Sequence, residues 1–453
     1  MARIRVECEP RITWDPVVGG PGEQYVHLGA VIDSGRRRTV KFDADGNFVV
    51  LEVGKRGSGK SFGLGSIMEA FAAAADTCTI AKQSPNRRGV LLLDPLDVHW
   101  TAIYPVRKDG SVHMQEQYKL LERFPEVAVE PINVAVYMPA GRGRPEDPAV
   151  FRAYHLPVCD LTSEDFALLY GANLVSDPAG MLIGEIHDKV SRLGFTRGAT
   201  DVPAKEVFGL QDLIDCLQDT DIQANYTVQT LRAVRQRLLS WLRDPLFQQP
   251  SGTPVTELVQ PGRMGILCLN RLSEEMRNVV TAVIVRRLKA DRSRASNLER
   301  DRAFNPHPLN RPAGLPRTIL AIDEAQMILP ATGNSHARSA IESYVLEGRN
   351  FGLSIWMATQ RPRGAISERA KSQIDTLIVH KLSTAEDLEA VAGLLQSAEP
   401  LKIKVNESVV PLAELTRSLD VGMAIVSSGN GNVHRAFVVE MRPRVVAHGG
   451  QAF

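Results

Sequence analysis

The chain has 453 residues, of which 44% are apolar and 23% are charged, and its formal net charge is +1. These values exclude an intrinsically disordered or fibrous protein, and the length suits about two or three domains or one large α/β domain with insertions. The near-zero net charge gives no general reason to expect a protein that coats nucleic acid, although it leaves room for a local basic patch.

The cysteines and the apolar stretches indicate a cytoplasmic protein. The five cysteines are scattered and form no C-x-x-C pair, as expected for reduced thiols with structural roles. The first residues lack the apolar core of a signal peptide, and no apolar stretch approaches the ~20 residues that span a bilayer. We therefore expect a soluble protein in the cytoplasm, without a membrane partner.

The first third of the chain is predicted to begin the α/β core. Residues 1–45 contain short extended segments with glycine-rich breaks, which predicts a small β-rich N-terminal domain. Residues 46–160 form the first part of the core, with an apolar strand at 48–53, a helix after the following glycine-rich turn and a second strand at 90–93. Prolines are frequent between 105 and 150, which predicts a loop-rich stretch.

The remaining chain is predicted to hold a helical insertion and the second part of the core. Residues 161–250 have amphipathic helical spacing, and Thr162 with Asp165 resembles a capping box at their start. Within residues 251–453 the predicted strands are 264–269, 318–322, 353–358 and 376–380, followed by a hairpin of 423–428 and 433–439. Strands that alternate with helices imply an α/β fold with a mainly parallel sheet.

The segment from Gly54 to Ser61, GKRGSGKS, fits the phosphate-binding pattern G-x-x-x-x-G-K-[ST] between a strand and a helix. Glycines let successive backbone N–H groups point at phosphates, and the helix dipole adds positive potential. Lys60 is then predicted to reach the β- and γ-phosphates of ATP, and the Ser61 hydroxyl to bind Mg²⁺. The alternative, a chance glycine-rich turn, does not explain the strand–loop–helix context. The predicted nucleotide-binding residues are Gly54, Arg56, Gly57, Ser58, Gly59, Lys60, Ser61 and Phe62.

Two carboxylates, Asp323 and Glu324, follow the predicted strand 318–322. At a strand end beside a phosphate-binding loop, Asp323 is predicted to contact Mg²⁺ and Glu324 to polarise the water that attacks the γ-phosphate. Taken alone, such a pair is more often only the start of a loop. Together with the phosphate-binding loop, the catalytic interpretation is the better one.

Two further residues adjoin the predicted strand 353–358. Gln360 follows it and is a candidate to sense the γ-phosphate or orient water, with an ordinary strand-end amide as the equal alternative. Arg349 precedes it and could act as an arginine finger in a neighbouring subunit, but on physical grounds alone an exposed surface arginine is favoured.

Four segments together resemble the HerA–FtsK group of ring ATPases, and HerA in particular: GKRGSGKS, LLLDP at 91–95, ILAIDEA at 319–325 and EGRNFGLSIWMATQRP at 347–362. The resemblance implies a RecA-like core in a homo-hexamer, with ATP sites between subunits and double-stranded DNA in the central channel. It also implies that Arg349 acts in trans and that Gln360 is the sensor. Residues 1–45 would correspond to an abbreviated β-barrel.

The chain departs from the family pattern at two places. After Asp94-Pro95 it has Leu96 to His99 instead of His-Gly-Glu, so that Asp97 is the candidate replacement for the family's acid. Gln326 stands where a histidine is common.

The leading interpretation is therefore an ATP-driven motor that moves double-stranded DNA for a separate nuclease or defence effector. The alternative is a nucleotide-dependent hexameric scaffold for an effector enzyme, as in HerA-like anti-phage systems. A conjugative or chromosome-partitioning pump is a third, less favoured possibility because no membrane segment is recognised. The sequence contains a basic run, which is interpreted as a solvated helix face rather than a DNA contact: Arg286, Arg287, Lys289 and Arg292.

Overall fold

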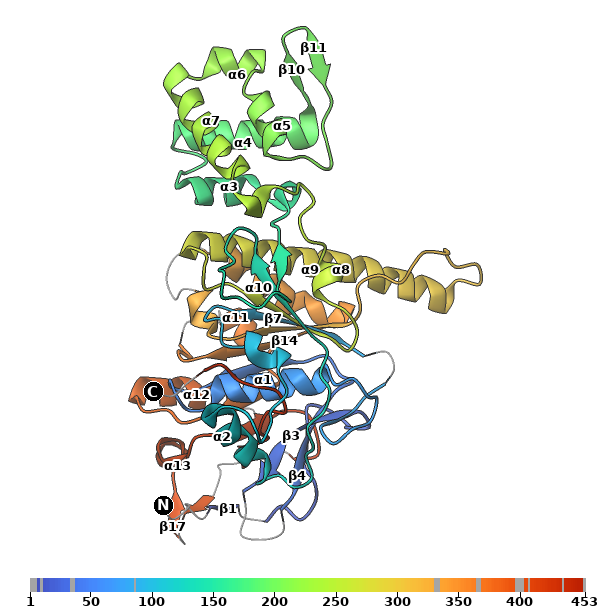
Figure 1. Ribbon diagram of the computed structural model, residues 1–453, viewed down its shortest axis with the longest axis vertical. Coiled ribbons are helices and arrows are strands. Elements are labelled where there is room, and N and C mark those ends of the chain that lie inside the picture. The colour runs from blue at the N-terminus through green and yellow to red at the C-terminus, as the bar shows by residue number, and fades with distance from the viewer. Residues whose placement is uncertain are drawn as a thin grey trace.

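The computed structural model describes residues 6–8, 11–32, 37–84, 87–329, 335–363, 368–395, 403–405, 408–433 and 436–450. Among the described helices, none combines the length and the apolar character needed to cross a membrane. The fold is a mixed α/β layer structure with a helical lobe at one end (Figure 1). Three strand predictions, 48–53, 90–93 and 318–322, are confirmed to within one residue by β5, β7 and β13, at Val49–Val53, Gly89–Asp94 and Thr318–Ile322.

A long central sheet forms the core. Its strand order is β2-β4-β3-β19-β18-β15-β5-β14-β13-β7-β12-β8-β9, and β6 (Ala81–Lys82) pairs with β3. The strands from β15 to β9 run parallel to one another, whereas β18, β19 and β3 are antiparallel to their neighbours. The remaining bounds are β2 Val17–Val18, β3 Tyr25–Val31, β4 Thr39–Asp43, β8 Val134–Pro139, β9 Arg152–Tyr154, β12 Met264–Cys268, β14 Leu353–Thr359, β15 Thr376–Val379, β18 Met423–Ser428 and β19 Phe437–Met441.

The central strands are buried on both faces, as expected for a parallel sheet covered by helices. Alternate side chains of β5, for example Leu51 and Val50, belong to different core clusters. The Val50 cluster contains apolar residues of α1 (Lys60–Phe71), and the Leu51 cluster contains those of α9 (Glu274–Phe304) and α10 (His336–Glu347). These helices therefore cover opposite faces of the sheet.

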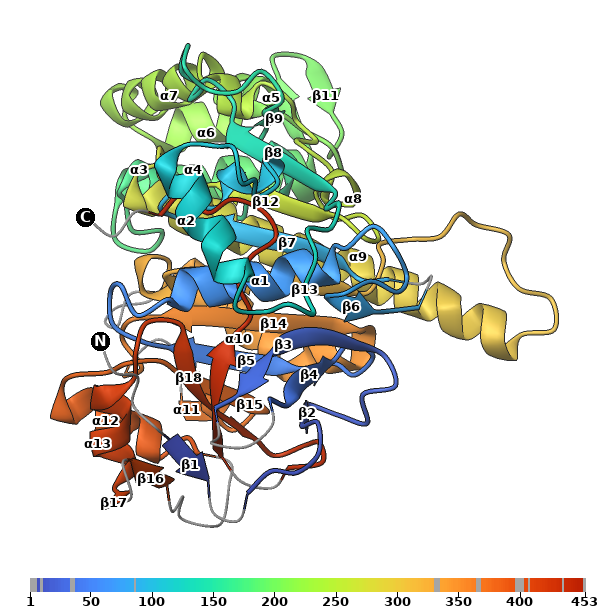
Figure 2. The same cartoon turned by 60° about the horizontal axis from the view of Figure 1, so that its bottom comes forward.

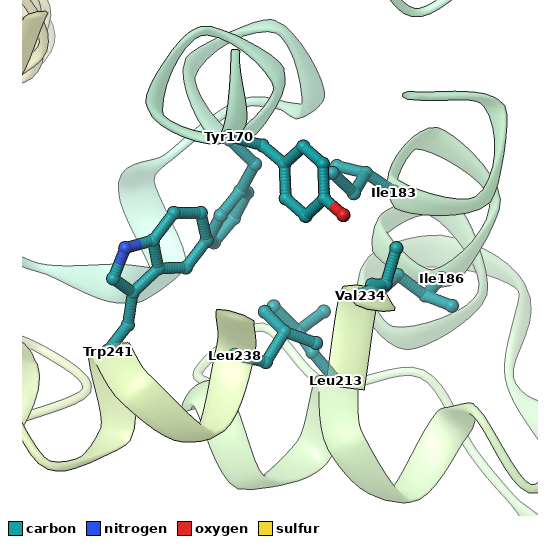
Figure 3. A pocket seen from close by; sticks show the side chains of 8 residues that line it. Tyr170, Ile183, Ile186, Leu213, Val234, Leu238 and Trp241 are labelled. Atoms are coloured by element: carbon teal, nitrogen blue, oxygen red, sulfur yellow. The ribbon is translucent and has the colours of Figure 1, made fainter. Parts of the chain in front are cut away.

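The predicted helical insertion is a lobe of short helices beside the sheet (Figures 1 and 2). Its elements are α3 Ser163–Tyr170, α4 Pro178–Asp188, α5 Leu210–Cys216, α6 Thr220–Asn225, α7 Val228–Leu242 and the hairpin of β10 Phe195–Arg197 and β11 Thr200–Val202. The capping box of Thr162 and Asp165 is confirmed at the start of α3. Aromatic and aliphatic side chains converge inside the lobe (Figure 3), and the space between them is too small for a water molecule. This interior is packing rather than a ligand site.

The lobe is attached to the core through α9. Arg287 Nη1 donates to Asp160 Oδ1 at 2.8 Å, and Arg286 forms an ion pair with buried Asp165. His336 Nδ1 of α10 lies 2.8 Å from the other oxygen of Asp165. These contacts fix the base of the insertion on the helices that cover the sheet.

Two expectations need correction or qualification. The stretch 105–150 is loop-rich as predicted, but it also contains α2 (Val112–Leu121), capped by the Ser111 hydroxyl, and the buried strand β8, which were not predicted. The lead-in strands β2, β3 and β4 continue the central sheet beside β19, while β1 (Val6–Cys8) pairs with β16 (Ile403–Val405), which in turn pairs with β17 (Ser408–Val410). The domain limits at 45/46, 160/161 and 250/251 remain predictions.

Candidate functional site

The candidate site lies at the carboxyl ends of four neighbouring strands. The order β5-β14-β13-β7 places the segments after Val53, Thr359, Ile322 and Leu93 side by side. These segments are the predicted phosphate-binding loop, Gln360, the acidic pair and Asp94. Ligands of open parallel sheets bind at this edge.

The phosphate-binding loop has the backbone that its glycines permit. Gly57 and Gly59 have φ of +75° and +97°, a region that favours glycine. A Cβ atom at Gly54 would lie 2.6 Å from Ser58 Oγ and 2.7 Å from His380 Cβ. The loop is fixed to the sheet because the Gly54 amide donates to Thr359 O at 3.2 Å and the Lys55 amide to Lys381 O at 3.0 Å.

Lys60 brings the loop and the acidic pair together. Its side chain is 3% exposed, and its Nζ donates to Glu324 Oε1 at 3.1 Å and lies 4.0 Å from Asp323 Oδ1. The structure therefore brings together Lys60, Asp323 and Glu324, although 263 and 264 positions separate them along the chain. An incoming phosphate group can form a charge-assisted hydrogen bond with this buried ammonium.

Asp323 is held in one orientation by several donors. Its Oδ1 accepts from the Glu324 amide at 2.9 Å, and its Oδ2 lies 3.0 Å from His99 Nε2. Burial alone would raise the pKa of Asp323, but hydrogen bonds from His99 and Ser61 and the charge of Lys60 lower it far below its ordinary value. The carboxylate is therefore ionised and lies beside Ser61, as a Mg²⁺ contact requires.

Glu324 occupies an unusual backbone conformation, with φ of +44°. Such values are uncommon outside glycine and cluster at functional sites. Its Oε1 accepts from Gln360 Nε2 at 2.8 Å, and its Oε2 accepts from Gln326 Nε2 at 2.5 Å. Gln326 in turn accepts from the Thr359 hydroxyl at 2.8 Å and so connects β14 to the Glu324 carboxylate.

His99 is the site residue that sequence reasoning missed. Its amide donates to Asp94 Oδ2 at 2.7 Å, and its ring is fully buried against Asp323. Burial raises the pKa of Asp94 to about 6. By contrast, the side chain of Asp97 turns to the Asn270 amide at 3.3 Å and to Arg271 Nε at 3.8 Å, so it does not replace the family's acid at this site. The only sequence signal for His99 was its position five residues after the strand-end Asp94.

Behind His99 lies a buried charged cluster from α1 and the end of β19. Glu69 forms ion pairs with Arg442 at 2.9 Å and with Arg444 at 3.5 Å. Arg444 Nη1 lies 3.4 Å from His99 Nδ1 and 3.1 Å from His448 Nδ1. These contacts connect the chain segment after β19 to the candidate site.

Arg349 is not brought to the site of its own chain. It lies in a 3₁₀ turn (Gly348–Phe351) before β14, at the opposite edge of the sheet, where its guanidinium pairs with Asp375. Its side chain remains 40% exposed. Lys55, Arg56 and Gly57 of the loop are exposed at the other edge.

The donors present fit a magnesium nucleotide. Ser58 Oγ is buried and has no hydrogen-bond partner among the residues that the structure describes, and it lies in the predicted phosphate-binding loop. Within the described part of the chain, no cluster of three or more His, Cys, Asp or Glu side chains could hold a metal ion by itself. Mg²⁺ does not require such a cluster, because it usually binds one or two protein oxygens together with phosphates. Ser61 and Asp323 would supply the protein ligands. Phe62 packs edge-on against the His448 ring, with centroids 5.6 Å apart, so its predicted nucleotide contact remains a prediction.

The chain resembles known proteins over part of its length. No protein-family model matches the chain. It is 27% identical over 180 residues to "DNA double-strand break repair helicase HerA" of Saccharolobus solfataricus, covering 39% of this chain and 31% of that protein. The protein of the same name from Sulfolobus acidocaldarius is 25% identical over 38% of this chain and 30% of its own length. Over these segments the chain is therefore similar to HerA helicases.

The overall fold is similar to that of a solved structure. The structure of VirB4 from Thermoanaerobacter pseudethanolicus matches with a TM-score of 0.53 and 14% identity, over 93% of this chain and 98% of that one. This match supports the fold alone. The chain spans about a third of the length of the curated HerA relatives it matches, with coverage of 30–32%.

Proposed function

We propose that this protein is a cytoplasmic, Mg²⁺-dependent ATPase that assembles as a homo-hexamer and moves double-stranded DNA for a separate nuclease or defence effector. The observation that carries the proposal is the buried contact of Lys60 with Glu324 at 3.1 Å, beside Asp323. The similarity to HerA helicases over part of the chain supports the DNA substrate.

The proposed chemistry uses each residue in one role. Lys60 moves its ammonium from Glu324 to the β- and γ-phosphates, which frees the Glu324 carboxylate. Glu324 accepts a proton from the attacking water while the bond between the γ-phosphorus and the ADP oxygen breaks. Ser61 and Asp323 would hold Mg²⁺, which would supply positive charge beside the phosphates. Gln360, which donates to Glu324 at 2.8 Å, orients the water or senses the γ-phosphate.

Arg349 is proposed to act at the site of a neighbouring subunit. Its partly exposed side chain supports this role. The length of a strand separates it from the phosphate-binding loop of its own chain, because it precedes β14 whereas the loop follows the neighbouring strand β5. An arginine supplied in trans stabilises the charge on the transferring phosphate group.

A nucleotide-dependent hexameric scaffold for an effector enzyme is the second candidate. It is favoured by one observation: Asp97, the candidate replacement for the family's acid, faces Arg271 and not the site. In this case nucleotide binding would organise the ring with little translocation.

Steady-state ATP hydrolysis with and without linear double-stranded DNA distinguishes the two, with Lys60→Ala as the blank. Turnover that rises several-fold with DNA and disappears in the variant supports the motor. Hydrolysis that does not respond to DNA contradicts the motor and supports the scaffold. Hydrolysis that does not exceed the blank contradicts an ATPase that works without a partner.

A further inference from the structure

Helix α7 presents an exposed basic face on the helical insertion. Residues 228–243 contain four arginines and no aspartate or glutamate. All four are exposed, and the three that lie along one side of the helix, Arg232, Arg235 and Arg243, are called the arginine face here. The fourth, Arg237, lies over the Tyr170 and Trp241 rings, 5.6 Å and 5.9 Å from their centroids.

The arginine face is a continuous strip along the helix. With about 3.6 residues per turn, positions 232, 235 and 243 fall on one side, together with the exposed polar residues Gln236 and Ser240. The strip extends over roughly 16 Å, at about 1.5 Å per residue. The opposite side of α7 is buried and directs Leu238 and Trp241 into the interior of the lobe (Figure 3).

The arginine face differs from the basic run of α9 in whether its cations are paired with carboxylates. In that run Arg287 pairs with Asp160 at 2.8 Å, Lys289 with Glu347 at 2.7 Å and Arg292 with Glu299 at 2.6 Å. Carboxylates of the same chain therefore neutralise the cations of this run. For Arg232, Arg235 and Arg243, no ion pair or hydrogen bond of the side chain occurs within the residues that the structure describes.

We propose that the arginine face binds the phosphate backbone of double-stranded DNA. This inference rests on the proposed function, which supplies the polyanion. Arginine, glutamine and serine side chains are typical donors to phosphate oxygens, and such contacts position a protein without reading sequence. The same positive charges would also attract an acidic protein. The uncharged donors between the arginines, Gln236 and Ser240, suit the closely spaced phosphates of DNA better. The binding is independent of DNA sequence.

Binding of this kind has a measurable salt dependence. Each phosphate that an arginine neutralises contributes about −0.9 to the slope of log K against log salt concentration for duplex DNA. Removal of the arginine face should therefore lower the affinity and also make the slope shallower by about one for each phosphate that is no longer neutralised. A variant that is only misfolded would not show this change of about one in slope for each lost phosphate contact.

The test compares the full chain with the triple variant Arg232→Gln, Arg235→Gln and Arg243→Gln. Fluorescence anisotropy with a labelled duplex would give the affinity at several salt concentrations. The matched control changes the same number of charges at exposed arginines that do have a carboxylate within 4.0 Å: Arg107→Gln, Arg144→Gln and Arg192→Gln. Hydrolysis without DNA should remain unchanged in both variants, which shows that they are folded.

We expect the triple variant to bind the duplex at least about tenfold more weakly with a shallower slope, and the control to match the wild type. If the wild type binds and the triple variant keeps the same affinity and slope, the inference is overturned and the proposed function stands. This is the outcome expected if the arginine face instead docks an acidic protein. If the wild type does not bind duplex DNA, the proposed function itself fails, and this inference with it.

Discussion

The Nε2 atom of His99 lies 3.0 Å from Oδ2 of Asp323, and both side chains are fully buried. On the other side of the ring, Nδ1 faces the Arg444 guanidinium at 3.4 Å. Because a guanidinium only donates, Nδ1 must accept, so that Nε2 carries the hydrogen and donates it to Asp323. His99 thus fixes the carboxylate that is proposed to contact Mg²⁺.

Replacement of His99 should therefore weaken the use of Mg²⁺. In His99→Ala, Asp323 loses a buried donor, and we expect the Mg²⁺ concentration for half-maximal ATP hydrolysis to rise by about 10- to 100-fold, as for other residues behind metal ligands. His99→Gln keeps a donor and should recover part of the loss. A Mg²⁺ titration of steady-state hydrolysis gives the result, with thermal melting as the control for folding. An unchanged Mg²⁺ requirement in His99→Ala would contradict this role.

Glu324→Gln should separate ATP binding from hydrolysis. The amide preserves the shape of the side chain but cannot accept a proton from water, so we expect hydrolysis to fall by about 10²- to 10⁴-fold while binding of a fluorescent ATP analogue remains. The matched control is Asp97→Asn, a nearby acid that faces Arg271 instead of the site. Equal losses in the two variants would show that Glu324 has no special part in the chemistry.

The sequence predicted those parts of the site that depend on local patterns. The phosphate-binding loop and the acidic pair follow strands that read as short apolar runs, because parallel strands are buried on both faces. The capping box of Thr162 and Asp165 is equally local, since the two residues satisfy each other's backbone amides. The motifs also place Lys60, the first residue of α1, and Glu324, just after β13, at the same edge of the sheet, where the two side chains meet.

What the sequence did not predict depends on contacts between distant segments. The contact of His99 with Asp323 and Arg444 joins three separate segments, and no spacing along the chain marks it. Helix α2 and strand β8 were missed because prolines around them suggested loop, although only the interior of an element excludes proline. The basic run of α9 was predicted to be a solvated helix face, but Arg292 is buried, and the ion pairs with Asp160 and Glu347 were not foreseen.

Mixing experiments should show whether Arg349 acts in trans. Arg349→Ala and Lys60→Ala are each expected to be inactive. In mixed rings, a Lys60→Ala subunit would supply its intact Arg349 to the intact phosphate-binding loop of an Arg349→Ala neighbour. We therefore expect hydrolysis to return to a measurable fraction of the wild-type rate. The double variant Lys60→Ala/Arg349→Ala cannot supply the arginine and is the control. Without recovery in the first mixture, the trans role would have to be abandoned.

His27 makes the fold sensitive to acid, away from the candidate site. Its ring is 2% exposed, and its Nε2 donates to Gly29 O at 3.0 Å. Burial, with help from the charge of Arg442, lowers the pKa of His27 to about 3, against the opposing hydrogen bond to Gly29. Between pH 6.5 and about 3 the unfolded chain therefore binds a proton that the folded chain excludes.

It follows that the free energy of unfolding should fall as the pH is lowered below 6.5, by up to about 1.4 kcal/mol per pH unit from this residue alone. His27→Gln keeps a donor for Gly29 O but does not titrate, so its free energy of unfolding should decline less steeply between pH 6.5 and 4. Urea denaturation at a series of pH values measures both curves, and the acidic residues that also titrate affect them equally. The difference between the curves should grow steadily as the pH falls, because the penalty exists only where unfolded His27 is protonated. Two parallel curves would mean that the ring accepts its proton inside the fold.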